Sequence, residues 1–163
     1  INKQRHKLMI VAKHSVKAKA RKEDIWPFYA NLAVWPDWDE DIVYARIHEP
    51  NNFACGAKGV IKPAGGPKVK FELSEVSNDE SFTVTSYLPL TKMIFAHYLN
   101  DNPDGTITIT HEVEMIGITS PIFAFIIGRK IKANLPDAMN KLVKLAESKS
   151  LISLRQGFVG QEG

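Results

Sequence analysis

The chain has 163 residues, of which 44% are hydrophobic and 24% are charged. These proportions exclude a disordered chain and are typical of one globular domain, which at this length needs neither disulfides nor a structural metal. The only cysteine is Cys55, which excludes an intramolecular disulfide and a cysteine-based zinc site. The net charge of +3 is a mild basic excess.

Much of this basic excess lies near the N-terminus. A basic arm of this kind can contact phosphate or anionic lipid, but lysines that alternate with small residues also describe the exposed face of a strand. No aromatic residue separates them to stack on bases, so we favour the strand face and expect no nucleic-acid partner. Eight of the 21 basic residues lie in the first 22 positions: Lys3, Arg5, Lys7, Lys13, Lys17, Lys19, Arg21 and Lys22.

No stretch of the sequence approaches the ~20 apolar residues of a membrane-spanning helix. The apolar run 122–127 is short and ends at Gly128-Arg129-Lys130, so we expect no stable membrane insertion. A single cysteine is compatible with a reducing compartment, and we expect a cytoplasmic protein. Because the sequence begins at Ile1 rather than Met, an upstream targeting segment stays an open alternative.

The first predicted elements are one strand and two short helices. Residues 10–20 alternate between lysines and smaller or apolar residues, as in a half-buried strand. Over residues 25–32 the apolar spacing becomes that of a short amphipathic helix, with Pro27 in its first turn. Residues 34–39 predict a second short helix or a tight turn, with Pro36 near its start.

From residue 42 the pattern becomes almost entirely that of strands joined by short turns. The turn before the last strand contains Pro-Asp-Gly, in which Gly105 can adopt the positive φ of a tight hairpin. Short connections imply antiparallel neighbours. The six predicted strands span residues 42–48, 57–62, 68–74, 82–87, 92–99 and 106–115.

The last predicted element is a long helix from Ser120 to about Lys149. Ser120 is a suitable N-cap and Pro121 suits the first helical position, whereas Pro136 should kink the helix near residues 133–134. A seven-stranded antiparallel sheet with one long helix must bury its apolar face on that helix. We therefore predict an α+β fold in which a curved sheet wraps around the helix.

We expect this fold to form one ligand-binding domain over residues 1–149. Residues 150–163 are polar and contain glycine, which predicts a mobile C-terminal tail.

The segment 25–39 (IWPFYANLAVWPDWD) resembles the start of the polyketide cyclase/dehydratase and lipid-transport superfamily. That group shares the helix-grip fold of START domains and birch-pollen allergens, and the resemblance extends over about residues 11–147. It implies an internal cavity, but the group includes lipid carriers, hormone receptors, aromatic-ring cyclases and oxygenase subunits, so function must be argued from the site. Further similar positions are Gly56, Gly59, His97, Gly105, Thr106, Thr110, His111, Gly117, Ala146 and Glu147.

Three histidines are expected on the inward face of the sheet. The hairpin geometry places His97 and His111 opposite each other or one diagonal step apart, and His14 lies on the inward face of the first strand, which should pair with the last. They can hydrogen-bond the polar end of a ligand, act as general acid and base, or hold a metal, with Asp39 or Asp41 orienting one of them. The alternative is a set of core histidines satisfied by backbone carbonyls or water.

The cavity itself is expected between the sheet and the long helix. Gly128 removes side-chain volume there, which predicts a void. The short-range spacing typical of metal ligands is missing from the sequence, so we predict no metal and no cofactor. Beside His14, His97 and His111, we predict that the residues lining the site are Trp38, Asp39, Phe71, Phe82, Phe95, Ile109, Phe123 and Ile127, although the phenylalanines also suit a plain core.

Three functions are compatible with these features. The first is binding or transport of a hydrophobic small molecule, lipid-like or similar to an aromatic polyketide, with His97 and His111 on its polar end. The second is an enzyme of cyclase or dehydratase type, in which His97 or His111 moves a proton. The third is an interaction module that docks its basic N-terminal surface on an anionic partner. The sequence leaves the oligomeric state open.

Overall fold

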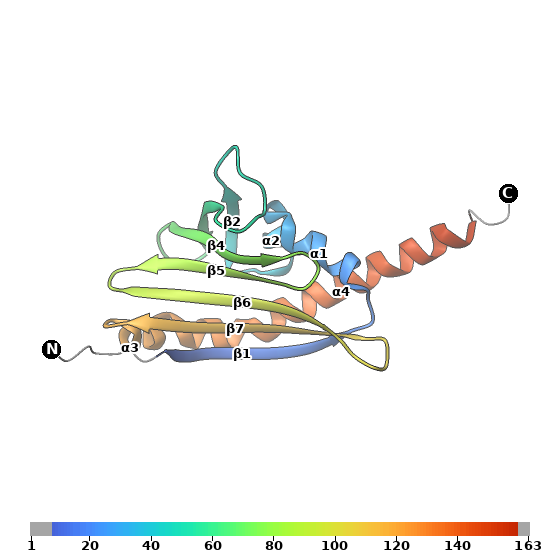
Figure 1. Cartoon of the computed structure of the whole chain (residues 1–163). Helices are drawn as coiled ribbons and strands as arrows, with labels where there is room; N and C mark the ends of the chain where they lie inside the picture. The colour runs from blue at the N-terminus through green and yellow to red at the C-terminus, as the bar shows by residue number, and fades with distance from the viewer. Residues whose placement is uncertain (1–7, 160–163) are drawn as a thin grey trace.

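The computed structural model in Figure 1 describes residues 8–159 as one curved sheet with a long helix behind it. All seven strands are antiparallel, in the order β1-β7-β6-β5-β4-β3-β2, so the first strand pairs with the last. This confirms the predicted sheet. Its strands are β1 (Met9–Ala18), β2 (Ile42–Ile47), β3 (Lys58–Pro63), β4 (Val69–Ser77), β5 (Ser81–Leu88), β6 (Thr91–Asp101) and β7 (Ile107–Gly117).

Short helices follow β1, and a long helical segment follows β7. In Figure 1 the long helix runs behind the sheet and its C-terminal part passes α1, which confirms the predicted helix-grip arrangement. None of the described helices is both long and apolar enough to cross a membrane. The helical elements are α1 (Lys22–Ala30), the 3-10 turn η1 (Leu32–Val34), α2 (Trp35–Trp38), α3 (Ser120–Phe123), the π-helical turn η2 (Ala124–Gly128) and α4 (Arg129–Val159).

The core lies between the concave face of the sheet and α4. Along β7 every second side chain from Ile107 to Met115 is buried, because alternate side chains of a strand point to one face. On α4 the buried residues Leu135, Met139 and Leu142 recur at helical spacing. Burying each such side chain contributes about 1.5–3 kcal/mol, so this stripe holds the helix against the sheet.

Two predictions about the long helix are wrong. The helix does not end near Lys149 but continues to Val159, and Ser150 is buried; residues 160–163 of the predicted tail lie outside the described part. Gly128 does not create a void, because a Cβ there would lie 2.5 Å from Cγ1 of Val11. The missing side chain instead allows β1 to approach the helix closely. Helix α4 continues through Pro136, where the kink stays a prediction.

Candidate functional site

Three histidines lie side by side across the concave face of the sheet. His14 on β1 is directly opposite His111 on β7, and His111 is directly opposite His97 on β6. The next strand continues the row with Phe82, which is opposite His97. The predicted register is therefore confirmed, and it follows from strand alternation together with the hairpin turn at Gly105.

His111 is a buried histidine with a hydrogen-bond partner. The hydroxyl of Tyr29, which α1 places over the sheet, lies 2.8 Å from Nε2 of His111. Burial lowers the pKa of His111 well below its ordinary value, and the nearby His97 and His14 lower it further. Burial also raises the pKa of Tyr29. Both groups are therefore uncharged near neutral pH. The partner of His111 is Tyr29, so the expectation that Asp39 or Asp41 orients one of the histidines does not apply to His111.

His97 is equally buried but incompletely satisfied. Its ring stacks between Phe82, at a centroid distance of 4.0 Å, and Phe95, at 4.5 Å. Desolvation lowers the pKa of His97 to about 3, although backbone groups of Phe82 and Phe95 act in the opposite direction. No group in the described part of the chain meets hydrogen-bond geometry with its Nδ1 atom. A buried nitrogen left in this state costs about 1–3 kcal/mol.

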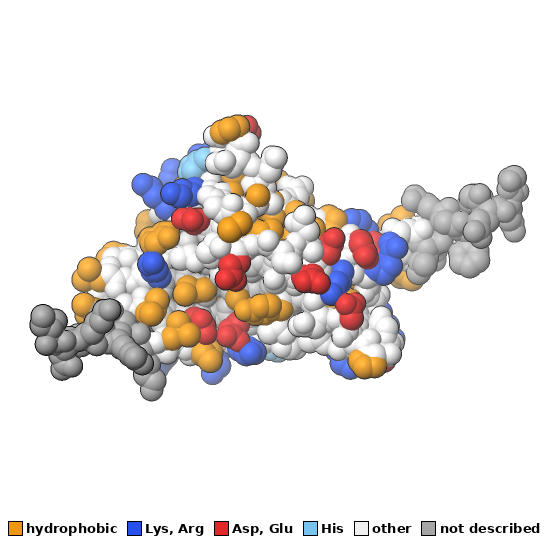
Figure 2. All heavy atoms as spheres, viewed as in Figure 1, with side chains coloured by type: hydrophobic (Ala, Val, Ile, Leu, Met, Phe, Trp, Pro, Cys, Tyr) orange, Lys and Arg blue, Asp and Glu red, His pale blue; other side chains and the backbone are white. Residues whose placement is uncertain are grey.

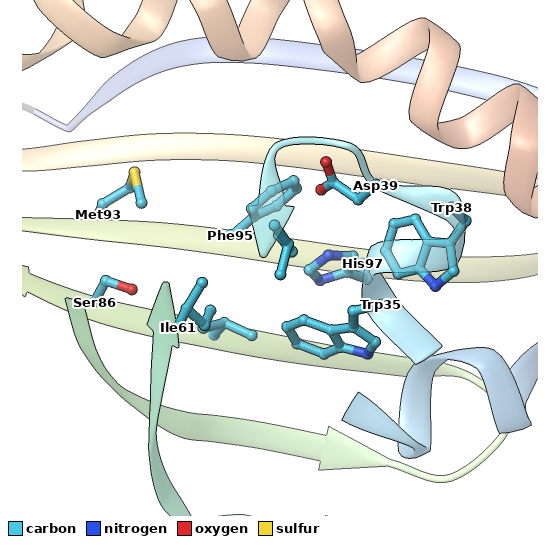
Figure 3. Close-up of a pocket in the computed structure, with 10 residues that line it drawn as sticks. Trp35, Trp38, Asp39, Ile61, Ser86, Met93, Phe95 and His97 are labelled. Carbon is cyan, nitrogen blue, oxygen red and sulfur yellow. The ribbon is translucent and has the colours of Figure 1, made fainter. Parts of the chain in front are cut away.

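A small, mostly apolar cavity adjoins His97. Its volume is about 60 Å³, enough for a few water-sized groups, whereas pockets for drug-sized ligands occupy roughly 300–1,000 Å³. Figure 3 shows the labelled side chains converging from the strands and from the α2 region. The ten residues that line the cavity are Trp35, Trp38, Asp39, Ile42, Ile61, Val84, Ser86, Met93, Phe95 and His97.

Asp39 is the acidic residue in this lining, and it follows α2 directly. Burial raises the pKa of Asp39 to about 6, although the backbone N–H of Asp41 donates to its carboxylate at 3.0 Å and opposes the rise. The cavity therefore contains a carboxyl group that titrates close to neutral pH, beside a histidine that stays neutral.

The loop between α2 and β2 is tied to α4 by polar contacts. The ammonium of Lys130 lies 2.8 Å from the carboxylate of Asp41, to which the side-chain amide of Asn134 also donates. Lys141 forms an ion pair with Glu40 one residue earlier. These contacts hold the segment that carries Asp39 against the long helix.

The structure brings four of the predicted site residues together at the cavity: Trp38, Asp39, Phe95 and His97. The others lie elsewhere, so their contact with a ligand stays a prediction. Phe71, Phe82, Ile109 and His111 are buried in the core outside the cavity lining, whereas His14, Phe123 and Ile127 are half-buried.

Sequence reasoning missed Tyr29 and Trp35 as site residues. Tyr29 has the helical spacing of a core residue, and its pattern does not indicate that its hydroxyl reaches a histidine. Met93 and Ser86 were also missed, although Met93 shares the inward face of β6 with Phe95 and His97 and could have been found from that alternation. Over the described residues, no group of three or more His, Cys, Asp or Glu side chains is placed to hold a metal ion.

These features define a helix-grip protein with a small, mostly apolar cavity beside a buried neutral histidine. Neither a protein-family model nor a curated protein matches the sequence. Solved structures do match. Truncated norcoclaurine synthase from Thalictrum flavum superposes with a TM-score of 0.64 and 17% identity, covering 89% of this chain and 97% of that one.

Two further solved structures resemble the chain. A hypothetical protein from Helicobacter pylori has a TM-score of 0.69 and 10% identity, over 90% of this chain and 91% of that one. The Thalictrum enzyme in complex with dopamine and hydroxybenzaldehyde has a TM-score of 0.61 and 18% identity, over 85% of each chain. At these identities the likeness establishes the fold, which is the one that the resemblance implied.

Proposed function

We propose that the chain binds a small apolar molecule with one hydrogen-bonding group, held in the cavity beside His97. The observation that carries this proposal is the unpaired Nδ1 atom of His97, in a residue that lines an otherwise mostly apolar space. Buried polar atoms in proteins nearly always have a partner, so an unpaired one beside a cavity favours a partner supplied by a ligand.

The chemistry of the wall favours an aromatic or similarly flat ligand. Trp35, Trp38 and Phe95 present aromatic surface, while Asp39 and Ser86 offer further polar contacts. A structure of the Thalictrum synthase is a complex with dopamine and hydroxybenzaldehyde, two small aromatic compounds with polar groups. A ligand of that size exceeds about 60 Å³, so binding includes loosening of the loop between α2 and β2.

The lowered pKa values of the histidines favour binding over histidine catalysis. A general acid or base works best when its pKa lies near the working pH. The pKa of His97 is about 3, and that of His111 is also depressed. His97, which lines the cavity, is therefore suited to hydrogen-bond a ligand as a neutral ring.

A second candidate function is proton transfer by Asp39 on a molecule bound in the same cavity. The pKa of about 6 for this carboxyl is what favours it, because such a group is present in both protonation states near neutral pH. The cyclase or dehydratase alternative is thus carried better by Asp39 than by His97 or His111.

The described part of the basic N-terminal segment supports the interaction-module alternative less well. Lys13 pairs with Glu112, Lys17 with Asp104, and Lys22 with Asp101. These partners offset the positive charge locally. Lys3, Arg5 and Lys7 lie outside the described residues.

Ligand binding is tested first by native mass spectrometry of protein purified from its own host. We expect a stoichiometric small mass that is lost on denaturation. Titration with small phenols and aromatic aldehydes should then show saturable binding that His97→Phe weakens about tenfold or more, the effect of losing a hydrogen bond to a buried group. Tyr98→Phe, on the outer face of β6, is the matched control. No bound mass and no saturable binding across the panel contradict the proposal.

The two candidate functions differ in what Asp39→Asn does. A binding protein has no turnover, so in that case this change only alters the affinity for the ligand, and modestly. In an enzyme it removes turnover more than binding, and the activity of the unmodified chain changes through pH 6 as Asp39 ionises. Absence of turnover with every compound that binds eliminates the enzyme candidate.

A further inference from the structure

We propose that one end of the molecule docks on the surface of an anionic lipid membrane. The surface in question, the apolar tip, is formed by large side chains that are each more than half exposed. Figure 2 shows hydrophobic side chains at the left end of the molecule, where Figure 1 places α3 and the turn between β5 and β6. The apolar tip comprises Leu90, Ile118, Ile122, Phe125 and Ile126.

Hydrogen bonds join the two connections that form the apolar tip. Thr91, which follows Leu90, pairs with Gly117 across the β6–β7 ladder, and its hydroxyl lies 2.8 Å from that of Thr119. The hydroxyl of Thr119 also donates to the carbonyl of Pro89. The turn before β6 and the connection into α3 are therefore held together, and their exposed side chains form a supported surface.

The helical part of the apolar tip is hydrophobic on its outer face as well as its inner one. Phe123 and Ile127 are half-buried, whereas Ile122, Phe125 and Ile126 are 58–65% exposed. An exposed surface helix normally carries polar residues outward. An outward apolar face at the end of a molecule is instead the property of segments that insert shallowly at a lipid interface.

The charged residues near the apolar tip are mainly basic, which favours docking on an anionic surface. Between Glu114 and Asp137 the charged residues are Arg129, Lys130 and Lys132, all basic, and Lys92 is the charged residue between Glu80 and Asp101. Lys130 is paired with Asp41, so the attraction to an anionic surface rests on Arg129, Lys132 and Lys92. The guanidinium of Arg129 lies 4.6 Å from the centre of the Phe125 ring, so its stem covers apolar surface while its charge can reach a phosphate. Two copies meeting through this basic rim would repel each other, which favours lipid over self-association.

This inference is independent of the cavity ligand. It explains the apolar run 122–127, which is far too short to span a bilayer, as an interfacial contact. Met93 and Ser86 at one end of the cavity are directly opposite each other on β6 and β5, a few residues from the turn that carries Leu90. A docked apolar tip would thus bring that end of the cavity towards the lipid.

The test is co-sedimentation of the whole chain with vesicles of phosphatidylcholine, with or without phosphatidylserine. We expect binding to the phosphatidylserine vesicles that weakens as salt rises. The double variant Phe125→Ser/Ile126→Ser should weaken it about 10-fold to 100-fold, as expected for loss of two buried apolar side chains. Leu151→Ser/Ile152→Ser removes an equally exposed pair elsewhere on the helix and should bind like the unmodified chain.

Insertion is measured directly with the variant Phe125→Trp and vesicles that contain brominated lipid. The brominated lipid should quench the tryptophan fluorescence of this variant more strongly than that of the unmodified chain. The inference is overturned if the unmodified chain does not bind phosphatidylserine vesicles, or if Phe125→Ser/Ile126→Ser binds as tightly. Equal binding to both kinds of vesicle contradicts the role of charge. A dimer in solution that becomes monomeric in Phe125→Ser/Ile126→Ser, without vesicle binding, would assign the apolar tip to a second copy.

Discussion

His97 and His111 are neighbours on adjacent strands of the same concave face, yet their surroundings differ. Above His111, α1 supplies the hydroxyl of Tyr29 at hydrogen-bond distance. Beside His97 the space is a cavity, and its Nδ1 atom lacks a partner among the described residues. The sheet presents the same side chain twice, and the elements packed on it decide which one is satisfied.

The difference separates a stabilising region from a candidate binding region. A buried histidine that is hydrogen-bonded contributes to a specific core, whereas one without a partner destabilises the empty protein and is available to a ligand. Four changes would sharpen or break this comparison.

The largest expected effect is acid destabilisation, which both histidines share. Because the folded-state pKa of His97 is about 3 against an ordinary 6.5, the unfolded chain binds more protons between these values. Stability is therefore fully present above about pH 6.5 and is lost as the pH falls towards 3, by on the order of 4 kcal/mol from this residue. Chemical denaturation of Asp39→Asn at a series of pH values measures this slope, because the raised pKa of Asp39 acts in the opposite direction between pH 6 and 4. An unchanged free energy of unfolding between pH 7 and 4 in that variant contradicts the burial of neutral histidines.

Tyr29→Phe should destabilise the protein by about 1–3 kcal/mol, because it leaves the buried Nε2 of His111 without its partner. Thermal or chemical unfolding measures the loss. Tyr98→Phe, on the exposed face of β6, should change stability by no more than about 0.5 kcal/mol. Equal effects of the two changes would mean that the hydroxyl of Tyr29 makes no net contribution.

His97→Phe should have the opposite effect to Tyr29→Phe and stabilise the ligand-free protein by about 1–2 kcal/mol. The aromatic stack with Phe82 and Phe95 is kept while an unpaired buried nitrogen is removed. The same variant should bind ligand about tenfold or more weakly and show a shallower loss of stability in acid. A destabilised variant would indicate that Nδ1 is satisfied in the protein.

The smallest expected effect on stability comes from Lys130→Ala at the loop between α2 and β2. Its ion pair with Asp41 is partly exposed, and such pairs contribute about 0–1 kcal/mol. The effect on the rate of ligand binding should be easier to detect than the effect on stability. If this contact limits entry to the cavity, the variant should associate with ligand faster in stopped-flow mixing. Lys17→Ala, which removes a remote surface pair with Asp104, is the matched control and should leave association unchanged.

The sequence by itself determined the sheet and the position of the histidines on it. Alternation along β6 and β7 is a local property, and the Pro-Asp-Gly turn sets the register, so the pairing of His97 with His111 could be predicted from residues close in sequence.

Only the tertiary structure decided what covers each histidine. Tyr29 and His111 are 82 positions apart, and Gly128 approaches Val11 from the other end of the chain. These contacts depend on how α1 and the long helix pack across the sheet, which no local pattern records. That packing decides that the space beside Gly128 is filled and that a cavity lies beside His97.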